Sequence, residues 1–263
     1  PKGASESVLV VGAGSTGLEA ALQAAKRGYR VTLAEATTSL GGRVAKERAL
    51  PGLSAWGRVA DYRTGQLAPL PNVEIYRDSR LTPEDILGMG ADHVAIATGA
   101  TWRRDAVARL HLYGIPTDPA MPVYTPDDLM AGNCPEGRTV ALYDDDHFYM
   151  GSVLAELLVA RGNRVHFITP AVKVAEWTDN TLEQGTIMRR LLEIGVEVHL
   201  SKAPEAIGKK EVILGCAWIG RQTALACDAV VLVTSRTPND ALFHQARALD
   251  WQGAGIKSLK LIG

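Results

Sequence analysis

The chain has 263 residues, of which 46% are hydrophobic, and its 28 basic and 29 acidic side chains give a formal net charge of −1. This length allows one large domain or two modest ones with a sizeable core. The balanced charge argues against nucleic acid or an anionic membrane as a partner. No run approaches the roughly 18 apolar residues of a transmembrane helix, so no membrane association is expected.

The three cysteines, Cys134, Cys216 and Cys227, are far apart, and the closest pair is separated by eleven positions. No CxxC pair or other metal-ligand spacing is present, so we predict neither a cluster nor a zinc site in this chain. Three buried, apolar thiols are the simpler interpretation. A sparse, odd number of cysteines fits the reducing cytoplasm, where we expect the protein to reside.

The strongest motif lies near the start of the chain, in VLVVGAGSTGLEAALQAAKRGYRVTLAE. An apolar run at 8–11 predicts a strand that is buried on both faces. An Ala- and Leu-rich helix follows and ends near Gly28, and a second strand is predicted at 31–34. Because a strand precedes the GxGxxG and a helix and an acid follow it, the motif indicates nucleotide binding rather than a simple turn.

The glycines of this motif have separate roles in a nucleotide-binding loop. Gly12 permits a tight turn, Gly14 has no side chain to block a pyrophosphate, and Gly17 lets the helix pack close to the strand. The helix begins at Ser15 and Thr16, where free N–H groups and the positive end of the helix dipole attract phosphate.

Glu35 ends the second strand, with Ala36 beside it, and its carboxylate can accept a hydrogen bond from a ribose 2′-hydroxyl. The same negative charge would repel a 2′-phosphate. We therefore predict an adenine nucleotide without that phosphate, which leaves FAD, NAD and ADP open and disfavours NADP.

Two further glycine-containing loops are predicted at the same site. In SLGGR, Gly41 and Gly42 allow the chain to pass close to a ribose or pyrophosphate, and Arg43 can meet a phosphate. An ordinary Gly-Gly turn is the alternative. Further on, ADHVAIATGAT reads as a buried strand that ends in Thr98 and Gly99.

The segment around residue 140 repeats this unit without its chemistry. The strand at 140–143 matches 8–11 at an offset of 132, whereas the following helix and strand match at 134, so the second loop is two residues longer. Aspartates occupy 144–146, and only the third glycine remains, as Gly151. Thr169 stands where the first unit has its acid.

This second loop is poorly suited to phosphate. Each aspartate beside a phosphate would cost on the order of 1 kcal/mol even with screening, and Phe148 and Tyr149 are bulky where a pyrophosphate would lie. We predict a nucleotide domain that kept its fold and lost its ligand. Two alternatives are that the acids hold a divalent cation that bridges to phosphate, or that the loop grips a nucleotide in an unusual way.

The order of these features resembles the C-terminal half of the trimethylamine dehydrogenase family, which includes histamine dehydrogenase and dienoyl-CoA reductase. The resemblance covers nearly the whole chain, and the loop without glycines is similar to the amine dehydrogenase branch and unlike the NADPH-using reductases. It rests on ALPGLSAW (49–56), DYR (61–63), GADHVAIATGATW (90–102), TPDDLM (125–130), HFYMGSVLAELLVARGNRV (147–165) and MRRL (188–191).

The resemblance implies parts that lie outside this sequence. Family members begin with a (β/α)8 barrel that binds FMN, followed by a cysteine-ligated 4Fe-4S cluster, and they pass electrons to an electron-transferring flavoprotein. The amine dehydrogenases hold ADP rather than a working FAD in the first nucleotide site, and a homodimer is expected at full length. Both ends of the chain look cut, so we expect a piece of a longer polypeptide with no catalytic residues and no activity of its own.

The resemblance also implies the fold class: α/β, with two Rossmann-like dinucleotide-binding domains of the glutathione-reductase type, the second inserted in the first. We place the FAD- or ADP-binding domain at 1–135, the degenerate NAD(P)-domain-like unit at 136–237, and a truncated return segment of the first domain at 238–263. The Pro-rich segments 116–126 and 133–138 are the predicted linkers.

Three functions follow from these features. The first is the ADP- or FAD-binding region of an amine-oxidising flavin and iron–sulfur oxidoreductase. The second is a self-contained FAD-dependent NAD(P)H oxidoreductase, which needs a second working nucleotide loop. The third is a non-catalytic nucleotide-binding or docking module. His93, in an apolar strand, is interpreted as structural, and His147 lacks metal-ligand partners at a useful spacing.

Overall fold

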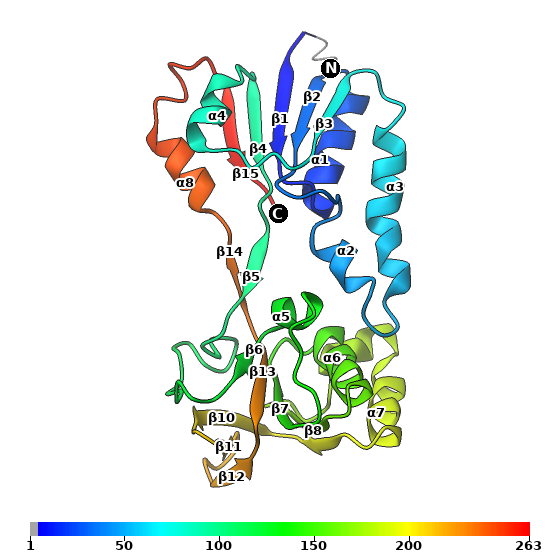
Figure 1. The fold of residues 1–263 in the computed structure, drawn as a ribbon, viewed down its shortest axis with the longest axis vertical. Helices are drawn as coiled ribbons and strands as arrows, with labels where there is room; N and C mark the ends of the chain where they lie inside the picture. Colours follow the sequence, from blue (N-terminus) through cyan, green and yellow to red (C-terminus); the bar gives the residue numbers. More distant parts are fainter. Residues whose placement is uncertain (1–4) are drawn as a thin grey trace. The chain divides into compact units, whose positions relative to one another are not determined.

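A computed structural model describes residues 5–263 and shows an α/β protein made of two compact units (Figure 1). Unit 1 contains the chain up to Ala49, Leu53–Ala100 and Pro238–Gly263, and unit 2 contains Leu50–Gly52 and Thr101–Thr237. Unit 2 therefore interrupts unit 1, which confirms the predicted insertion of one Rossmann-like domain in another.

Unit 1 is built on a five-stranded parallel sheet in the order β15-β4-β1-β2-β3. Alternate residues of the apolar first strand enter two different cores, Leu9 on one face and Val10 on the other, which explains its continuous hydrophobic run. The elements are β1 (Ser7–Val11), α1 (Ser15–Lys26), β2 (Arg30–Ala34), α2 (Arg43–Glu47), η1 (Ser54–Gly57), α3 (Arg58–Leu67), β3 (Val73–Tyr76), α4 (Pro83–Gly88), β4 (His93–Ile96), α8 (Ala241–Ala248) and β15 (Ser258–Leu261).

Unit 2 has a second five-stranded parallel sheet, in the order β6-β13-β7-β8-β9, and a three-stranded antiparallel sheet, β10-β11-β12. One hydrophobic cluster joins the two sheets, with Tyr143 and Leu232 from the first and Leu214 from the second. The elements are β6 (Val123–Tyr124), α5 (Pro126–Met130), β7 (Thr139–Asp144), α6 (Tyr149–Ala160), β8 (Arg164–Ile168), η2 (Glu176–Thr181), α7 (Gln184–Glu193), β9 (Glu197–His199), β10 (Lys202–Ile207), β11 (Glu211–Cys216), β12 (Gln222–Ala226) and β13 (Ala229–Val233).

The internal repeat has the predicted offsets. Helices α1 and α6 each have 12 residues and begin at Ser15 and Tyr149, and β2 and β8 begin at Arg30 and Arg164. The first strands begin at Ser7 and Thr139. The additional two residues of the second unit therefore lie in the loop between strand and helix.

The first boundary between the units differs from the sequence-based one at 135. The chain leaves unit 1 at Ala100, and residues 101–135 belong to unit 2 because β6 pairs with β13 and Thr117 bridges to Ile207. The Pro-rich segment 116–126 is thus part of unit 2 rather than a linker. The chain passes between the units at β5 (Ala100–Trp102) and β14 (Arg236–Pro238), which pair with each other.

Within residues 5–263, no helix combines the length and the apolar character needed to cross a bilayer.

Candidate nucleotide-binding site

The predicted site residues of unit 1 lie on three loops that leave the same edge of its sheet, or in the first turns of the helices α1 and α2 that follow two of them. These loops follow β1, β2 and β4, which are adjacent and parallel, so their carboxyl ends meet. The strand order reverses at β1, since β2 lies on one side of it and β4 on the other. Open α/β sheets bind their ligands outside such a reversal point.

The three glycines of the loop after β1 differ in what a side chain would meet. A Cβ on Gly12, where φ is +99°, would lie 2.5 Å from the carbonyl oxygen of Ala97, and one on Gly17 would lie 1.8 Å from that of Gly12. Gly14 has an ordinary φ of −68°, and none of the described atoms lies within 4 Å of its Cβ position. The fold requires Gly12 and Gly17, whereas the space beside Gly14 is open.

Helix α1 begins beside this open space. Gly14 is its N-cap, no side chain caps it, and its first turn, which includes Ser15 and Thr16, contains no acidic residue. The partial positive charge of the helix N-terminus is therefore not neutralised by an acid of that turn.

Glu35 is 9% exposed, and its carboxylate braces the loop after β1. One oxygen accepts the backbone N–H of Ala13 at 2.8 Å, and the other accepts the N–H and the hydroxyl of Thr37 at 2.9 and 2.8 Å. A carboxylate offers about four acceptor positions, so one remains for an outside donor such as a ribose hydroxyl. Ala36 is exposed next to it.

The paired glycines after β2 bring that loop against the loop after β1. The N–H of Gly41 donates to the carbonyl of Ala13 at 2.8 Å, and Gly41 forms a β-bridge with Gly14. A Cβ on Gly42, where φ is +56°, would lie 2.9 Å from the Cα of Gly14. The paired glycines thus let these two loops approach each other closely, and their approach to a ribose or pyrophosphate stays a prediction. The guanidinium of Arg43 donates to the carbonyl of Ala100 at 3.0 Å.

The loop after β4 is held by the segment that returns from unit 2. The hydroxyl of Thr98 donates to the carbonyl of Asn239 at 2.5 Å, and the N–H of Asn239 donates to the carbonyl of Gly99 at 2.9 Å. Gly99 is exposed, with φ at +73°. These two hydrogen bonds fix the turn at Thr98 and Gly99, which follows the residue that lies next to Gly12, Ala97.

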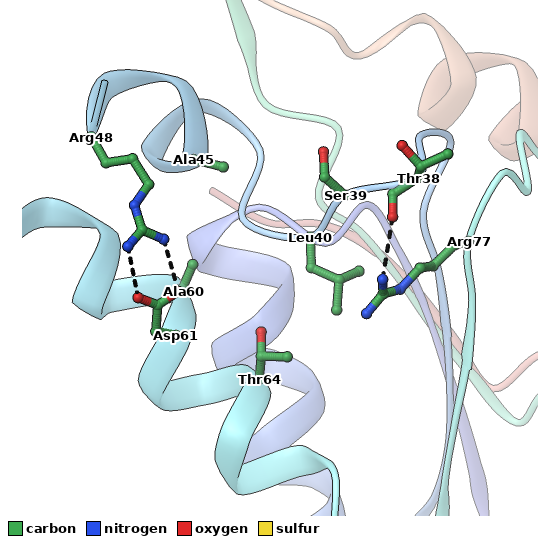
Figure 2. A pocket seen from close by; sticks show the side chains of 9 residues that line it. All are labelled: Thr38, Ser39, Leu40, Ala45, Arg48, Ala60, Asp61, Thr64 and Arg77. Carbon is green, nitrogen blue, oxygen red and sulfur yellow. Dashed lines mark hydrogen bonds and ion pairs between the residues drawn. The ribbon is translucent and has the colours of Figure 1, made fainter. Parts of the chain in front are cut away.

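A cavity of about 390 Å³ lies beside the loop after β2, and its lining includes none of the predicted site residues (Figure 2). Arg48 reaches Asp61 with two hydrogen bonds of 2.9 and 3.0 Å, and Arg77 donates to the carbonyl of Thr38 at 3.4 Å. Sequence reasoning missed these residues; the available signal was that Arg77 follows β3, whose carboxyl end lies at the same edge. The lining is Thr38, Ser39, Leu40, Ala45, Arg48, Ala60, Asp61, Thr64 and Arg77.

The corresponding loop of unit 2 is occupied by its own side chains. Asp144 takes the place of Gly12 and is fully buried, and a Cβ on Gly151 would lie 2.7 Å from its Cγ. Asp145 accepts the N–H of Leu110 at 3.0 Å and faces the ring Nε2 of His147 at 2.9 Å. The aspartates thus serve contacts within unit 2, where the first unit keeps open space.

Burial shapes the protonation of this second loop. Loss of hydration raises the pKa of Asp144 to about 7. Burial alone would lower the pKa of His147, but the hydrogen bond to Asp145 and the charges of Asp144 and Asp145 outweigh it and raise that pKa. A proton is therefore readily held in this loop.

The sequence matches two families: a NAD(P)-binding Rossmann-like domain at residues 10–76 and an OYE-like second alpha/beta domain at residues 124–218. Thioredoxin reductase of Lactococcus lactis, at 16% identity and a TM-score of 0.61, shares the fold. The predicted α/β class with two Rossmann-like domains is thereby confirmed.

More similar proteins align with the whole chain. The dimethylamine dehydrogenase of Hyphomicrobium sp. (strain x) is 32% identical over 290 aligned residues, which cover all of this chain and 39% of that protein. The structure of histamine dehydrogenase from Rhizobium sp. 4-9 is 56% identical with a TM-score of 0.97, and the match covers 41% of it. The 6-hydroxypseudooxynicotine amine oxidase from Pseudomonas geniculata N1 is 44% identical with a TM-score of 0.96 over 39% of its chain.

The sequence-based resemblance is confirmed by these matches, and the named relatives are oxidoreductases. The chain is homologous along its whole length to the dimethylamine and histamine dehydrogenases of the trimethylamine dehydrogenase family, and it spans about 40% of their length.

Proposed function

We propose that unit 1 binds an adenine nucleotide without a 2′-phosphate, either ADP or the ADP half of FAD. The observation that carries this proposal is the open space at Gly14, directly in front of the N-terminus of α1. A pyrophosphate placed there would receive hydrogen bonds from backbone N–H groups and the favourable end of the helix dipole. The neighbouring cavity of about 390 Å³ offers room for the remainder of the ligand.

Glu35 supports the choice among adenine nucleotides. Its remaining acceptor position suits a ribose hydroxyl, whereas a 2′-phosphate would bring like charges together at a cost on the order of 1 kcal/mol per pair in water and more where water is excluded. ADP, FAD and NAD satisfy this condition, and NADP does not.

The proposal extends to the protein that carries this chain. Two relatives are named for amine substrates, histamine and dimethylamine. We propose a cytoplasmic amine-oxidising enzyme, homodimeric at full length, whose FMN and 4Fe-4S cluster lie outside this chain and whose electrons pass to an electron-transferring flavoprotein. In this arrangement the present chain organises the nucleotide region and contributes no catalytic side chain.

A second candidate is a flavoenzyme that oxidises NAD(P)H. It is favoured by one relative, the NADH oxidase of Thermoanaerobacter brockii, which is 24% identical over 89% of this chain. Such an enzyme needs a nucleotide loop in unit 2, where the buried Asp144 stands in the place of Gly12 and the Asp145–His147 pair follows it. The first proposal agrees better with this loop.

Calorimetric titration of the protein with ADP, FAD, NAD and NADP tests the assignment. We expect ADP or FAD to bind at least about tenfold more tightly than NADP, a difference of about 1.4 kcal/mol. Tighter binding of NADP than of ADP would show that the Glu35 carboxylate does not select against a 2′-phosphate on the ribose. Rapid reduction of a bound flavin by NADPH would favour the second candidate instead.

A further inference from the structure

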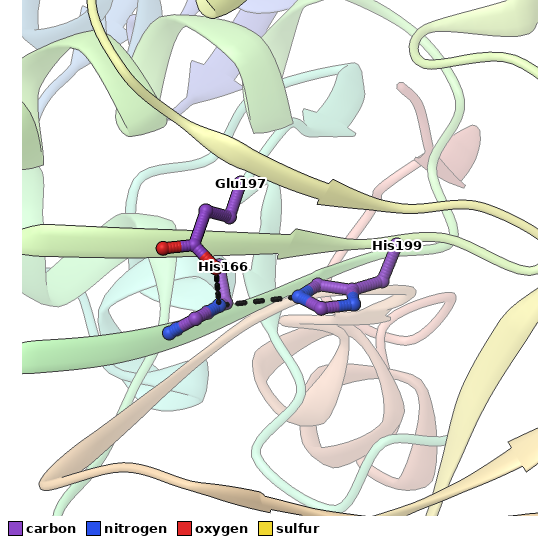
Figure 3. Close-up of side chains that lie close together, drawn as sticks. All are labelled: His166, Glu197 and His199. Atoms are coloured by element: carbon purple, nitrogen blue, oxygen red, sulfur yellow. Dashed lines mark hydrogen bonds and ion pairs between the residues drawn. The ribbon is translucent and has the colours of Figure 1, made fainter.

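Two histidines and a glutamate meet on neighbouring strands of unit 2 (Figure 3). His166 lies on β8, and Glu197 and His199 lie on β9, which is parallel to it. His166 pairs with Glu197 in the register, and Glu197 and His199 are two positions apart, so all three side chains leave the same face of the sheet. His166 is buried at 5% exposure, whereas Glu197 is exposed.

The distances among these groups match those among the ligands of one metal ion. The Nδ1 atom of His166 lies 3.1 Å from Nε2 of His199 and 3.4 Å from Oε2 of Glu197, and the three potential ligand atoms all lie within 4.8 Å of one another. Nitrogen and oxygen ligands about 2.0–2.1 Å from a tetrahedral zinc ion are separated by about 3.3 Å. An ion could therefore contact all three groups after small side-chain rotations.

A neighbouring arginine leaves one carboxylate oxygen of Glu197 available. Nε and Nη2 of Arg164 both donate to Oε1 of Glu197, at 2.9 and 2.6 Å, while Oε2 faces His166. Such an outer contact orients a ligating carboxylate. Arg164 and Lys202 are the cations near this group, and they oppose a further positive charge.

We propose that His166, Glu197 and His199 form a binding site for a divalent first-row transition-metal ion, with zinc as the probe ion. Two imidazoles and one carboxylate favour ions such as Zn²⁺ over Mg²⁺ or Ca²⁺, which prefer oxygen ligands. Three protein ligands leave a further position for water. The ion would tie the edge strand β9 to β8, at a place that contains none of the predicted nucleotide-binding residues.

The proposed site departs from the sequence-based expectation of no metal site, which rested on cysteine spacing. His166 precedes Glu197 by 31 positions and His199 by 33 positions in the chain, and only the fold brings the three side chains together. The remaining sequence signal is the Glu-x-His alternation of β9, which places both side chains on one face.

The test is a zinc titration of the intact protein after chelatable metal has been removed, in competition with a chromogenic chelator. The variants are His199→Ala and Glu197→Gln, and the control is His244→Ala, an exposed histidine of unit 1 that faces Asp240 at 3.3 Å. We expect one zinc ion per chain at this site. Its affinity should fall by at least about tenfold in each ligand variant and should be unchanged in the control.

A second readout separates metal binding from damage to the fold. Zinc should raise the unfolding temperature of the wild type and of His244→Ala, but not that of His199→Ala or Glu197→Gln, whose spectra without zinc should match the wild type. Glu197 is exposed, so its conversion to glutamine should not impair folding. Equal zinc affinity in the wild type and both ligand variants would overturn the proposal and leave the three side chains as a hydrogen-bonded structural cluster.

Discussion

Gly14 is the position where the demands of a ligand and of the fold can be separated. We expect Gly14→Val to weaken binding of ADP by more than about 100-fold, because its branched side chain would enter the space assigned to the pyrophosphate. Its effect on stability should be limited to about 1 kcal/mol, the usual cost of a poor N-cap residue. Calorimetry and urea unfolding measure the two effects on one sample.

The matched control for Gly14 is Gly17. In Gly17→Ala the new Cβ would lie 1.8 Å from the carbonyl oxygen of Gly12, so the helix must shift and stability should fall by several times more than in Gly14→Val. A Gly14→Val protein that binds ADP as tightly as the wild type would place the pyrophosphate elsewhere.

Asp144 should make unit 2 less stable as the pH rises. Its pKa is about 7 in the folded protein, because of burial, and near 4 in an unfolded chain. The folded state therefore holds more protons at this group than the unfolded state between these values, so the contribution of Asp144 to stability is greatest below about pH 4 and is lost as the pH rises to about 7. The raised pKa of His147 acts in the same direction.

Asp144→Asn should remove most of this pH dependence. The variant keeps an oxygen that can accept the N–H of Asp146, now 3.3 Å from Asp144, but carries no charge. Hydrogen exchange of β7 and α6 at pH 5 and pH 8 measures their opening free energies. We expect the variant to be more stable than the wild type at pH 8, with about 4 kcal/mol as the upper limit. Equal slopes for the two proteins would mean that Asp144 is ionised when folded.

Two short helices share the motif Thr-Pro-x-Asp, and they allow a matched comparison. The carboxylate of Asp85 in α4 accepts the N–H and the hydroxyl of Thr82, both at 2.8 Å, and it is exposed. Asp128 in α5 makes the same two contacts with Thr125, at 2.7 and 2.8 Å, and also an ion pair of 2.5 Å with Arg104.

We expect Asp128→Ala to cost about 2 kcal/mol and Asp85→Ala less, because charge-assisted hydrogen bonds contribute more when they are shielded from water. Chemical denaturation of both variants gives the two values. A larger loss for Asp85 would show that the contact with Arg104 adds nothing.

At the level of single elements, local pattern predicted the β1–α1–β2 unit and its repeat well. The apolar run, the glycine spacing and the acid after β2 all lie within some thirty residues. Each of these patterns is typical of one structural element, so the element could be predicted from it. The partners of these residues were less predictable. Three contacts depend on how separate loops meet. They are the hydrogen bond from Ala13 to Glu35, the close approach of Gly42 to Gly14, and the hydrogen bond from Arg43 to Ala100.

The boundary at Ala100 was missed for a related reason. Residues 103–121 contain no helix or strand whose periodicity would reveal their unit, and β6 has only two residues. Their place is set by pairing with β13, more than one hundred positions later. Long-range pairing of short strands leaves almost no local signal.

On the scale of the whole molecule, we expect a nucleotide to stabilise unit 1 alone. At a concentration of ADP about 100 times Kd, binding should add up to about 2.7 kcal/mol to the opening free energies of α1 and the loops around it. Helix α6 and the loop at 144–151 should remain unchanged, with ADP or with NADPH. Hydrogen exchange resolved by peptide distinguishes the units, and protection of α6 by NADPH would contradict the interpretation of its loop.

The interruption of unit 1 by unit 2 has a consequence for how the protein is made. Strand β15 pairs with β4, and Ser258 contacts His93 from 165 positions away. At about 5–20 residues per second, the ribosome delivers β15 roughly 8–30 s after β4. During that interval unit 2 can fold as a nearly continuous segment. The edge of β4 that later pairs with β15 stays without a partner, so it can form hydrogen bonds with strands of other chains. We therefore expect unit 1 to be the later-folding part and the main client of chaperones during synthesis.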